Sequence, residues 1–208
     1  TWVNWANNPN GNWSNNEDFG FNTSYMIRAN INEAEDILYK IKEYQLPKFE
    51  GEVNPNKTTF KSLEAASSYI KEHALKFGAN EVGIAKIEET DIYQNREIKE
   101  KYAIVVGQKM LWRKFQKVPS KESAVECLRV YFSLGETVIE LANHIRSIGY
   151  ECKVEHPIGD SDVLHIPLAL KAGFGELGRH GSIIHPQMGP LFRLGSVITS
   201  MPLSIDKP

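Results

Sequence analysis

The chain has 208 residues, of which 41% are hydrophobic and 24% are charged, and its formal net charge is −2 at pH 7. A chain of this length can bury one sizeable core, and its small negative charge disfavours nucleic acid or an anionic membrane surface as a partner. The sequence has no apolar run long enough to cross a membrane and no signal-peptide pattern. Because it opens on Thr1 rather than methionine, we expect a processed form or a fragment, from which a leader could have been removed.

The first 24 residues are crowded with asparagine, glycine and aromatic side chains and have neither helical nor strand periodicity. We predict an irregular N-terminal arm whose aromatic residues pin it to the core. The functional alternative is an aromatic wall over a small apolar substrate. The aromatic residues of this arm are Trp2, Trp5, Trp13, Phe19 and Phe21.

Two helices are predicted next. Asn30 and Glu33 form a plausible capping box for a helix over 31–44, which carries its apolar residues on one face. A polar connector follows, and Thr59 is the expected cap of a second helix that ends at Gly78.

Two short β-branched segments, 82–87 and 102–107, predict strands, and the second of them is apolar enough to be buried on both faces. Pro119 and Ser120 then open a long helix with an apolar stripe that ends at Gly149.

The last third of the chain mixes strands with one short helix. Residues 151–155 alternate like a strand, and 156–160 form a loop that delivers Asp162 as the cap of a short helix through Leu170. Residues 195–199 form a final core strand. The resulting order indicates an α/β sandwich without a clean alternation of parallel units. We expect one compact domain, in which an arm, helix and connector (1–57) precede the α/β core (58–208).

The only cysteines, Cys127 and Cys152, are too few for a disulfide framework and too far apart for a local zinc or iron–sulfur motif. A 4Fe–4S cluster needs four thiolates, so this chain alone cannot ligate one in the usual way.

The segment Ala172-Gly-Phe-Gly-Glu-Leu-Gly-Arg-His-Gly181 packs four glycines into ten residues, which suits a backbone brought close to a large ligand. A helix precedes it, whereas the dinucleotide fingerprint requires a strand, so a nicotinamide site is disfavoured. The structural alternative is a tight helix-to-strand connection with an exposed arginine.

This segment, together with the strand that follows it and the pair Pro202-Leu203, resembles the cobalamin-dependent reductive dehalogenases and the related epoxyqueuosine reductases. The sequence Gly-Glu-Leu-Gly-Arg-His-Gly resembles that of the dehalogenase branch. The queuosine branch usually has tryptophan and isoleucine before the second glycine and lysine-asparagine after it. The resemblance is strongest over 120–203 and more positional over 25–110.

The resemblance implies a nitroreductase-like α/β core in which the glycine segment embraces cobalamin, bound without a lower protein ligand. The implied cofactor-binding residues are Gly173, Gly175, Gly178, Arg179, His180 and Gly181. Arg179 would meet a phosphate or propionamide through its fork of donors. No metal site is predicted, because His180 and His185 lack a third ligand; we expect these residues, like His156 and His165, to be structural.

In that family a tyrosine near the upper face of the corrin donates a proton, supported by a cation that depresses its pKa and by a further polar side chain. Tyr131, close to Arg129 on the long helix, best fits the tyrosine, Arg193 the cation, and Asp160 the polar position. Packing on a partly apolar helix face is the alternative role for Tyr131.

The implied activity is reductive dehalogenation of a small organohalide, with electrons from iron–sulfur clusters whose cysteine motifs would follow Pro202-Leu203 in a longer chain. An electron-donor protein or iron–sulfur domain is the implied partner, with a separate membrane anchor on the extracytoplasmic face; a cytoplasmic location is the alternative. Three other hypotheses remain: a cobalamin-binding module without turnover, an epoxyqueuosine-reductase-like enzyme, and a flavin nitroreductase.

Overall fold

The computed structural model of the chain describes residues 31–158 and 161–208. Four strands form one sheet in the order β1-β2-β6-β3, and every neighbouring pair is antiparallel. The strands are β1 (Glu81–Lys86), β2 (Tyr102–Lys109), β3 (Cys152–Glu155) and β6 (Phe192–Thr199). The predicted α/β class is confirmed, and the antiparallel pairing agrees with the absence of a clean parallel alternation.

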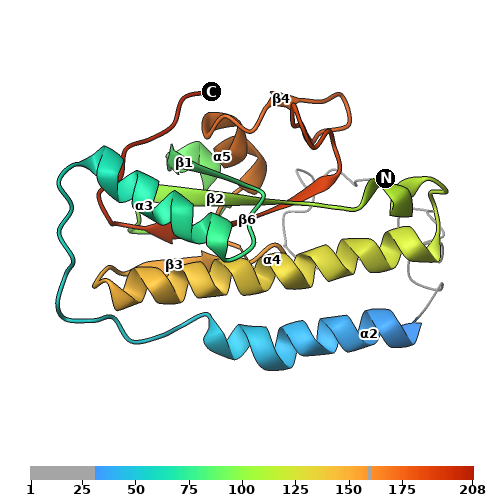
Figure 1. Cartoon of the computed structure of the whole chain (residues 1–208), viewed down its shortest axis with the longest axis horizontal. Coiled ribbons are helices and arrows are strands. Elements are labelled where there is room, and N and C mark those ends of the chain that lie inside the picture. Colours follow the sequence, from blue (N-terminus) through green and yellow to red (C-terminus); the bar gives the residue numbers. More distant parts are fainter. Residues whose placement is uncertain (1–30, 159–160) are drawn as a thin grey trace.

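Helices cover both faces of the sheet, as Figure 1 shows. On one face lie α3 (Leu63–Lys76) and the long α4 (Lys121–Ser147), and on the other lies α5 (His165–Lys171). α2 (Ile31–Lys40) and the π-helical turn η3 (Ile41–Gln45) contact α4 on the side away from the sheet (Figure 1). Within the described residues, no helix is both long and apolar enough to span a membrane.

The alternation of strand side chains divides the core in two. Along β6, Val197 packs with α3 and α4, whereas Phe192, Leu194 and Ile198 pack with α5. The same period of two places Arg193 on the α4 face, because it neighbours Phe192 and Leu194 in the strand. This sidedness decides which helix each functional side chain of β6 can reach.

α4 begins where its sequence predicts. The Ser120 hydroxyl accepts a hydrogen bond from Ser123 N at 3.2 Å, and the Ser123 side chain bonds back to Ser120. This reciprocal cap satisfies amide groups that a helix start leaves without partners. The apolar stripe of α4 then runs through the core as far as Ile145.

Two predicted caps are wrong. The second helix begins at Leu63 and is capped by Ser62, whose hydroxyl accepts from Ala65 N at 3.1 Å, rather than by Thr59. Asp162 does not cap α5, because its carboxylate pairs with Lys153 and with Arg96 instead. The capping box at Asn30 lies outside the described residues, as does the arm 1–24.

A small hairpin was not predicted from the sequence. It begins in the glycine segment and is formed by β4 (Glu176–Leu177) and β5 (Ile183–Ile184). Another difference is the length of β6, which begins three residues before the predicted strand at 195. Both differences place more ordered backbone around the segment that carries the predicted site.

After β6, the chain returns along β1. Asp206 N donates to Ile84 O at 2.9 Å, and Ile84 N donates to Asp206 Oδ2 at 2.7 Å. Ser67 Oγ accepts from Ser204 N at 2.8 Å, which ties the same stretch to α3. β1 is an edge strand, so these bonds cover part of an otherwise open edge.

Candidate functional site

The structure brings Tyr131 and Arg193 together. The Arg193 guanidinium carbon lies 4.9 Å from the centre of the Tyr131 ring, within cation–π distance. Tyr131 comes from α4 and Arg193 from β6, where it stands opposite Gln108 of β2. Two predicted site residues that are 62 positions apart in the chain are therefore in contact.

The pKa of the Tyr131 phenol is raised above its ordinary value, which differs from the predicted depression. Burial of the largely covered ring is the largest cause, and the charge of Arg193 opposes it without overcoming it. The phenol therefore keeps its proton at neutral pH, and Arg193 reduces the free energy needed to form the phenolate.

Arg129 is not the cation that faces Tyr131. Its guanidinium forms two hydrogen bonds to the buried Glu126 carboxylate, at 2.7 and 2.8 Å. Glu126 also accepts from Leu111 N at 2.8 Å. Burial would raise the pKa of Glu126, but these bonds and the arginine charge outweigh it and lower the pKa. This pair fixes the turn after β2 against the start of α4.

Asp160 lies outside the described residues. The loop is anchored on either side of it, because the buried Glu155 carboxylate accepts from Ser161 Oγ and from Asp162 N, both at 2.7 Å. Burial raises the pKa of Glu155, and these two hydrogen bonds oppose the rise.

In the glycine segment, two of the four predicted glycines are needed for packing within the chain. Gly173 and Gly175 have positive φ angles of 80° and 132°. A Cβ at Gly173 would lie 2.7 Å from Lys207 O, and one at Gly175 would lie 2.3 Å from Ile184 O. Their backbone approaches other backbone of the same chain.

The other two glycines shape the turn of the β4–β5 hairpin. Gly178 N donates to Ser182 O at 2.7 Å and Gly181 N donates to Gly178 O at 3.0 Å, so these amides are used inside the turn. Nothing lies within 4 Å of a Cβ built on Gly181, whose φ is 77°. Arg179 and His180 are exposed beside this open position. The exposed groups at the hairpin tip are therefore side chains, whereas the amides of Gly178 and Gly181 are used within the turn.

His185 is buried and makes contacts within the fold. Its buried ring accepts from Gln187 N and Met188 N through Nδ1, at 3.1 and 3.2 Å, and Nε2 lies 3.4 Å from Glu81 Oε2. These contacts fix the connection from the hairpin to β6.

His156 and His165 are also buried inside the fold. His156 Nε2 bonds Gln45 at 2.9 Å, and Nδ1 of His165 lies 3.4 Å from Ser196 Oγ. Burial lowers the pKa of each ring to about 4, against an opposing backbone hydrogen bond in each case. Both rings are therefore neutral at pH 7, as structural histidines in a core are.

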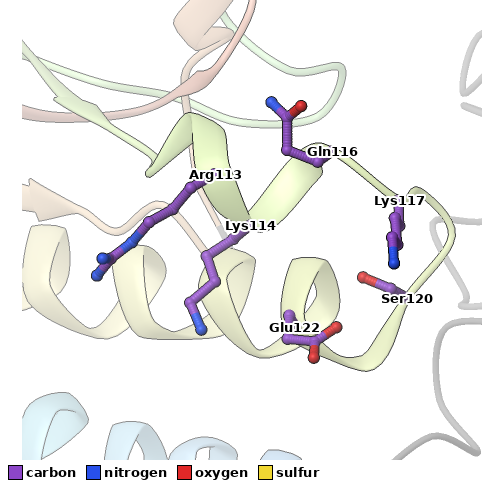
Figure 2. Close-up of a pocket in the computed structure, with 6 residues that line it drawn as sticks. All are labelled: Arg113, Lys114, Gln116, Lys117, Ser120 and Glu122. Carbon is purple, nitrogen blue, oxygen red and sulfur yellow. The ribbon is translucent and has the colours of Figure 1, made fainter.

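A surface pocket of about 460 Å³ lies where η6 (Trp112–Phe115) leads into α4. Figure 2 shows the basic side chains of Arg113, Lys114 and Lys117 around the start of the helix. The helix cap is already satisfied by the Ser120 and Ser123 pair. This pocket adds no residue to the site around Tyr131.

Comparison with curated proteins connects this geometry to one family. The chain is 34% identical over 90 residues to the tetrachloroethene reductive dehalogenase of Dehalobacter restrictus, and 32% identical over 106 residues to that of Sulfurospirillum multivorans. These matches cover 43% and 50% of this chain. Over these segments the chain is similar to reductive dehalogenases. No family model matches it.

The matched segments make up only 16% and 20% of those two relatives, so the chain corresponds to a small part of their length. Epoxyqueuosine reductases are also similar: that of Shewanella oneidensis is 34% identical over 70 residues, covering 33% of this chain and 18% of the relative. The resemblance to both branches, given above on the glycine segment, is confirmed.

Solved structures show the same fold. The catabolic reductive dehalogenase NpRdhA superposes with a TM-score of 0.75 at 23% identity, covering 84% of this chain and 27% of NpRdhA. An epoxyqueuosine reductase bound to a tRNA stem loop superposes with a TM-score of 0.54 at 15% identity, covering 69% and 47% of the two chains.

Two buried residues were missed from the sequence. Cys127 contacts Arg193 of the site, and Gln45, outside the site, is fully buried against His156. The spacing of four residues between Cys127 and Tyr131 on one helix face was a usable signal for the first. No local pattern distinguishes Gln45 from the exposed polar residues around it.

Proposed function

We propose that this chain is part of a reductive dehalogenase that removes halogen from a small organohalide at a cobalamin cofactor, with Tyr131 as the proton donor. The contact between Arg193 and the Tyr131 ring, 4.9 Å from guanidinium carbon to ring centre, is the observation that carries the proposal. The family supports it, since two curated relatives are tetrachloroethene reductive dehalogenases. One structural relative is described in terms of B12-dependent dehalogenation.

The described residues fit the polar periphery of a corrinoid. Gly181 leaves open space where a Cβ would stand, and the exposed Arg179 and His180 flank it. Arg179 would hold a phosphate and His180 a propionamide, because a guanidinium donates in pairs to phosphate oxygens and an imidazole can donate to an amide carbonyl. When bound, cobalamin supplies the cobalt centre at which the carbon–halogen bond is reduced.

Replacing halogen by hydrogen consumes two electrons and one proton and releases a halide ion. Tyr131 holds that proton at Oη, and burial keeps it there at neutral pH by raising the pKa of the phenol. Arg193 stabilises the phenolate that remains after donation. Asp160 is proposed as the further polar side chain, and the anchored loop around it starts from Glu155 on β3.

The electrons would come from iron–sulfur clusters in a longer chain or from a separate donor protein. By the same family analogy, we propose a location at the extracytoplasmic face of the cell membrane, attached through an anchor subunit. Localisation by fractionation of cells that express the full protein tests this.

The decisive experiment is purification under anaerobic conditions with added cobalamin, followed by an absorption spectrum. A corrinoid spectrum that stays with the protein is expected; its absence refutes the proposal. With a strong low-potential reductant and chlorinated or brominated substrates, Tyr131→Phe should abolish halide release and retain the corrinoid. Tyr44→Phe, at an exposed position of η3, is the matched control and should change neither.

Three other outcomes would assign a different function. Corrinoid binding without halide release, under a reductant that sustains turnover in a known dehalogenase, indicates a binding module. Reduction of epoxyqueuosine in a tRNA stem loop would place the chain in the queuosine branch. A yellow flavin spectrum in place of a corrinoid would indicate a nitroreductase.

A further inference from the structure

Arg193 is shared between two side chains on consecutive turns of α4. Its Nη2 donates to Cys127 Sγ at 3.1 Å while its guanidinium carbon stays 4.9 Å from the Tyr131 ring centre. Cys127 precedes Tyr131 by four residues, so both point from the same face of the helix. The guanidinium therefore has a fixed anchor one turn before the ring that it covers.

The anchor itself is held in place. The Cys127 side chain is 7% exposed, and its thiol donates to Met110 Sδ at 3.8 Å. Met110 N in turn donates to Leu191 O at 2.8 Å, just before β6 begins. With its hydrogen directed at Met110, the sulfur presents lone pairs to Arg193.

We propose that Cys127 is a positioning residue, whose thiol holds the Arg193 guanidinium over the Tyr131 ring. Its effect on turnover rests on the proposed function, whereas its effect on the position of Arg193 does not. Cys127 touches neither of the proposed reactants and acts only through Arg193. The role also explains a buried thiol that forms no disulfide.

The other charged groups near the start of α4 have different partners. Glu126 and Arg129 bind each other, and Glu126 also binds Leu111 N. Among these groups, the charge that favours the Tyr131 phenolate is that of Arg193. Without the bond to Cys127, the guanidinium is held less firmly over the ring, and its stabilising effect on the phenolate declines as the distance grows.

The test measures the Arg193 side-chain NMR signals in the chain without cofactor, since the ring current of Tyr131 displaces protons above its face. Arg193→Lys assigns the signals. Cys127→Ala and Cys127→Val, which lack a hydrogen-bond acceptor, should lose the displacement, and Cys127→Ser should retain it. Cys152→Ala is the matched control, because Cys152 lies on β3 and bonds Ala142 O instead.

Retention of the displacement in Cys127→Ala or Cys127→Val would overturn the proposal, as would its loss in Cys127→Ser. Two acceptor-free variants are used so that one remains informative if the other fails to fold. In reduced, cobalamin-loaded protein, we expect Cys127→Ala to lower halide release about tenfold, part of the roughly 100-fold or more that a positioned proton donor contributes. Failure of all dehalogenation alongside the expected NMR changes would reject the proposed function and keep the positioning role.

Discussion

His156 Nε2 and Gln45 Oε1 form a hydrogen bond of 2.9 Å, which joins the loop after β3 to the π-helical turn on the far side of α4. Gln45 Nε2 continues the chain of bonds to Phe132 O and Glu136 Oε1, both at 2.8 Å. The two side chains meet across Gly135, in the middle of α4. A Cβ there would lie 2.2 Å from His156 Nε2 and 2.5 Å from Gln45 Oε1.

Gly135→Ala should therefore destabilise the chain, although alanine is the better helix former. We expect the free energy of unfolding to fall by about 2 kcal/mol, because the methyl group displaces a buried hydrogen bond. Chemical denaturation followed by circular dichroism measures it.

Without the contact between Gln45 and His156, the same substitution would stabilise the helix by about 1 kcal/mol. A stabilised Gly135→Ala variant would thus show that this buried network is not formed. In a Gln45→Ala background, the penalty of Gly135→Ala should shrink, because one of the two obstructing side chains is gone.

Acid should weaken the fold through His156 and His165. Their pKa values are about 4 in the folded chain and near 6.5 when unfolded, so the unfolded state binds more protons between these values. The free energy of unfolding should be constant above about pH 6.5 and fall as the pH drops toward 4, by up to about 1.4 kcal/mol per pH unit for each ring.

The raised pKa of Glu155 acts in the opposite sense over the lower part of that range, because the folded carboxyl binds its proton more readily. Denaturation at a series of pH values should give a smaller slope for His165→Gln than for the parent chain. His180→Gln, at an exposed position, should leave the slope as it is. Equal slopes for the parent and His165→Gln would show that His165 does not contribute to the pH dependence of the free energy of unfolding.

The glycines of the segment 172–181 should differ in how much stability the chain loses when each is replaced by alanine. At Gly175 the Cβ would meet Ile184 O at 2.3 Å with φ at 132°, so Gly175→Ala should cost about 3 kcal/mol of stability. At Gly181 only the left-handed φ opposes a side chain, at about 1 kcal/mol. If the hairpin tip faces cobalamin, Gly181→Ala should weaken corrinoid retention while the chain stays folded.

Equal corrinoid retention by Gly181→Ala and the parent, measured on folded protein, would remove the hairpin tip from the binding surface. Thermal unfolding by circular dichroism separates the stability effect of each substitution from its effect on the ligand.

Asp206→Ala should expose the edge of the sheet. Ile84 N would lose its acceptor, and the ion pair with Lys71 at 2.5 Å would be lost, so we expect about 1–2 kcal/mol of destabilisation. Asp206→Asn retains an acceptor for Ile84 N and should cost less than about 1 kcal/mol. Light scattering should show more association for Asp206→Ala, because an open edge strand can pair with another chain; equal scattering of both variants would contradict this.

The elements that the sequence predicted well are those set by local signals. Pro119 and Ser120 mark the start of α4, and the apolar run of β2 is continuous, so neither needs a distant partner to be identified. The β4–β5 hairpin was not predicted, because two-residue strands are too short to show an alternation of apolar and polar residues. The cap of α3 was misplaced by three residues, since Thr59 and Ser62 have the same capping chemistry.

The site was predicted by resemblance, and its physical details required the fold. Nothing near Tyr131 in sequence indicates that Arg193 would cover it, because the contact depends on how β6 packs on α4. The sign of the pKa shift was missed for the same reason, since burial of the ring exceeds the effect of the charge. Likewise, the close approach at Gly173 is to Lys207, 34 residues later in the chain.

The register of β6 against β2 decides whether Arg193 faces α4 or α5. β6 alternates between its two faces, so a shift of one residue against β2 would turn Arg193 toward the apolar side around Phe174 and α5, and place Phe192 or Leu194 against Tyr131. Single-residue insertions or deletions in the connection 185–191 should therefore break the contact between Arg193 and Tyr131 unless a bulge absorbs them, whereas two-residue changes should preserve it. Homologues of this chain should vary that connection in steps of two.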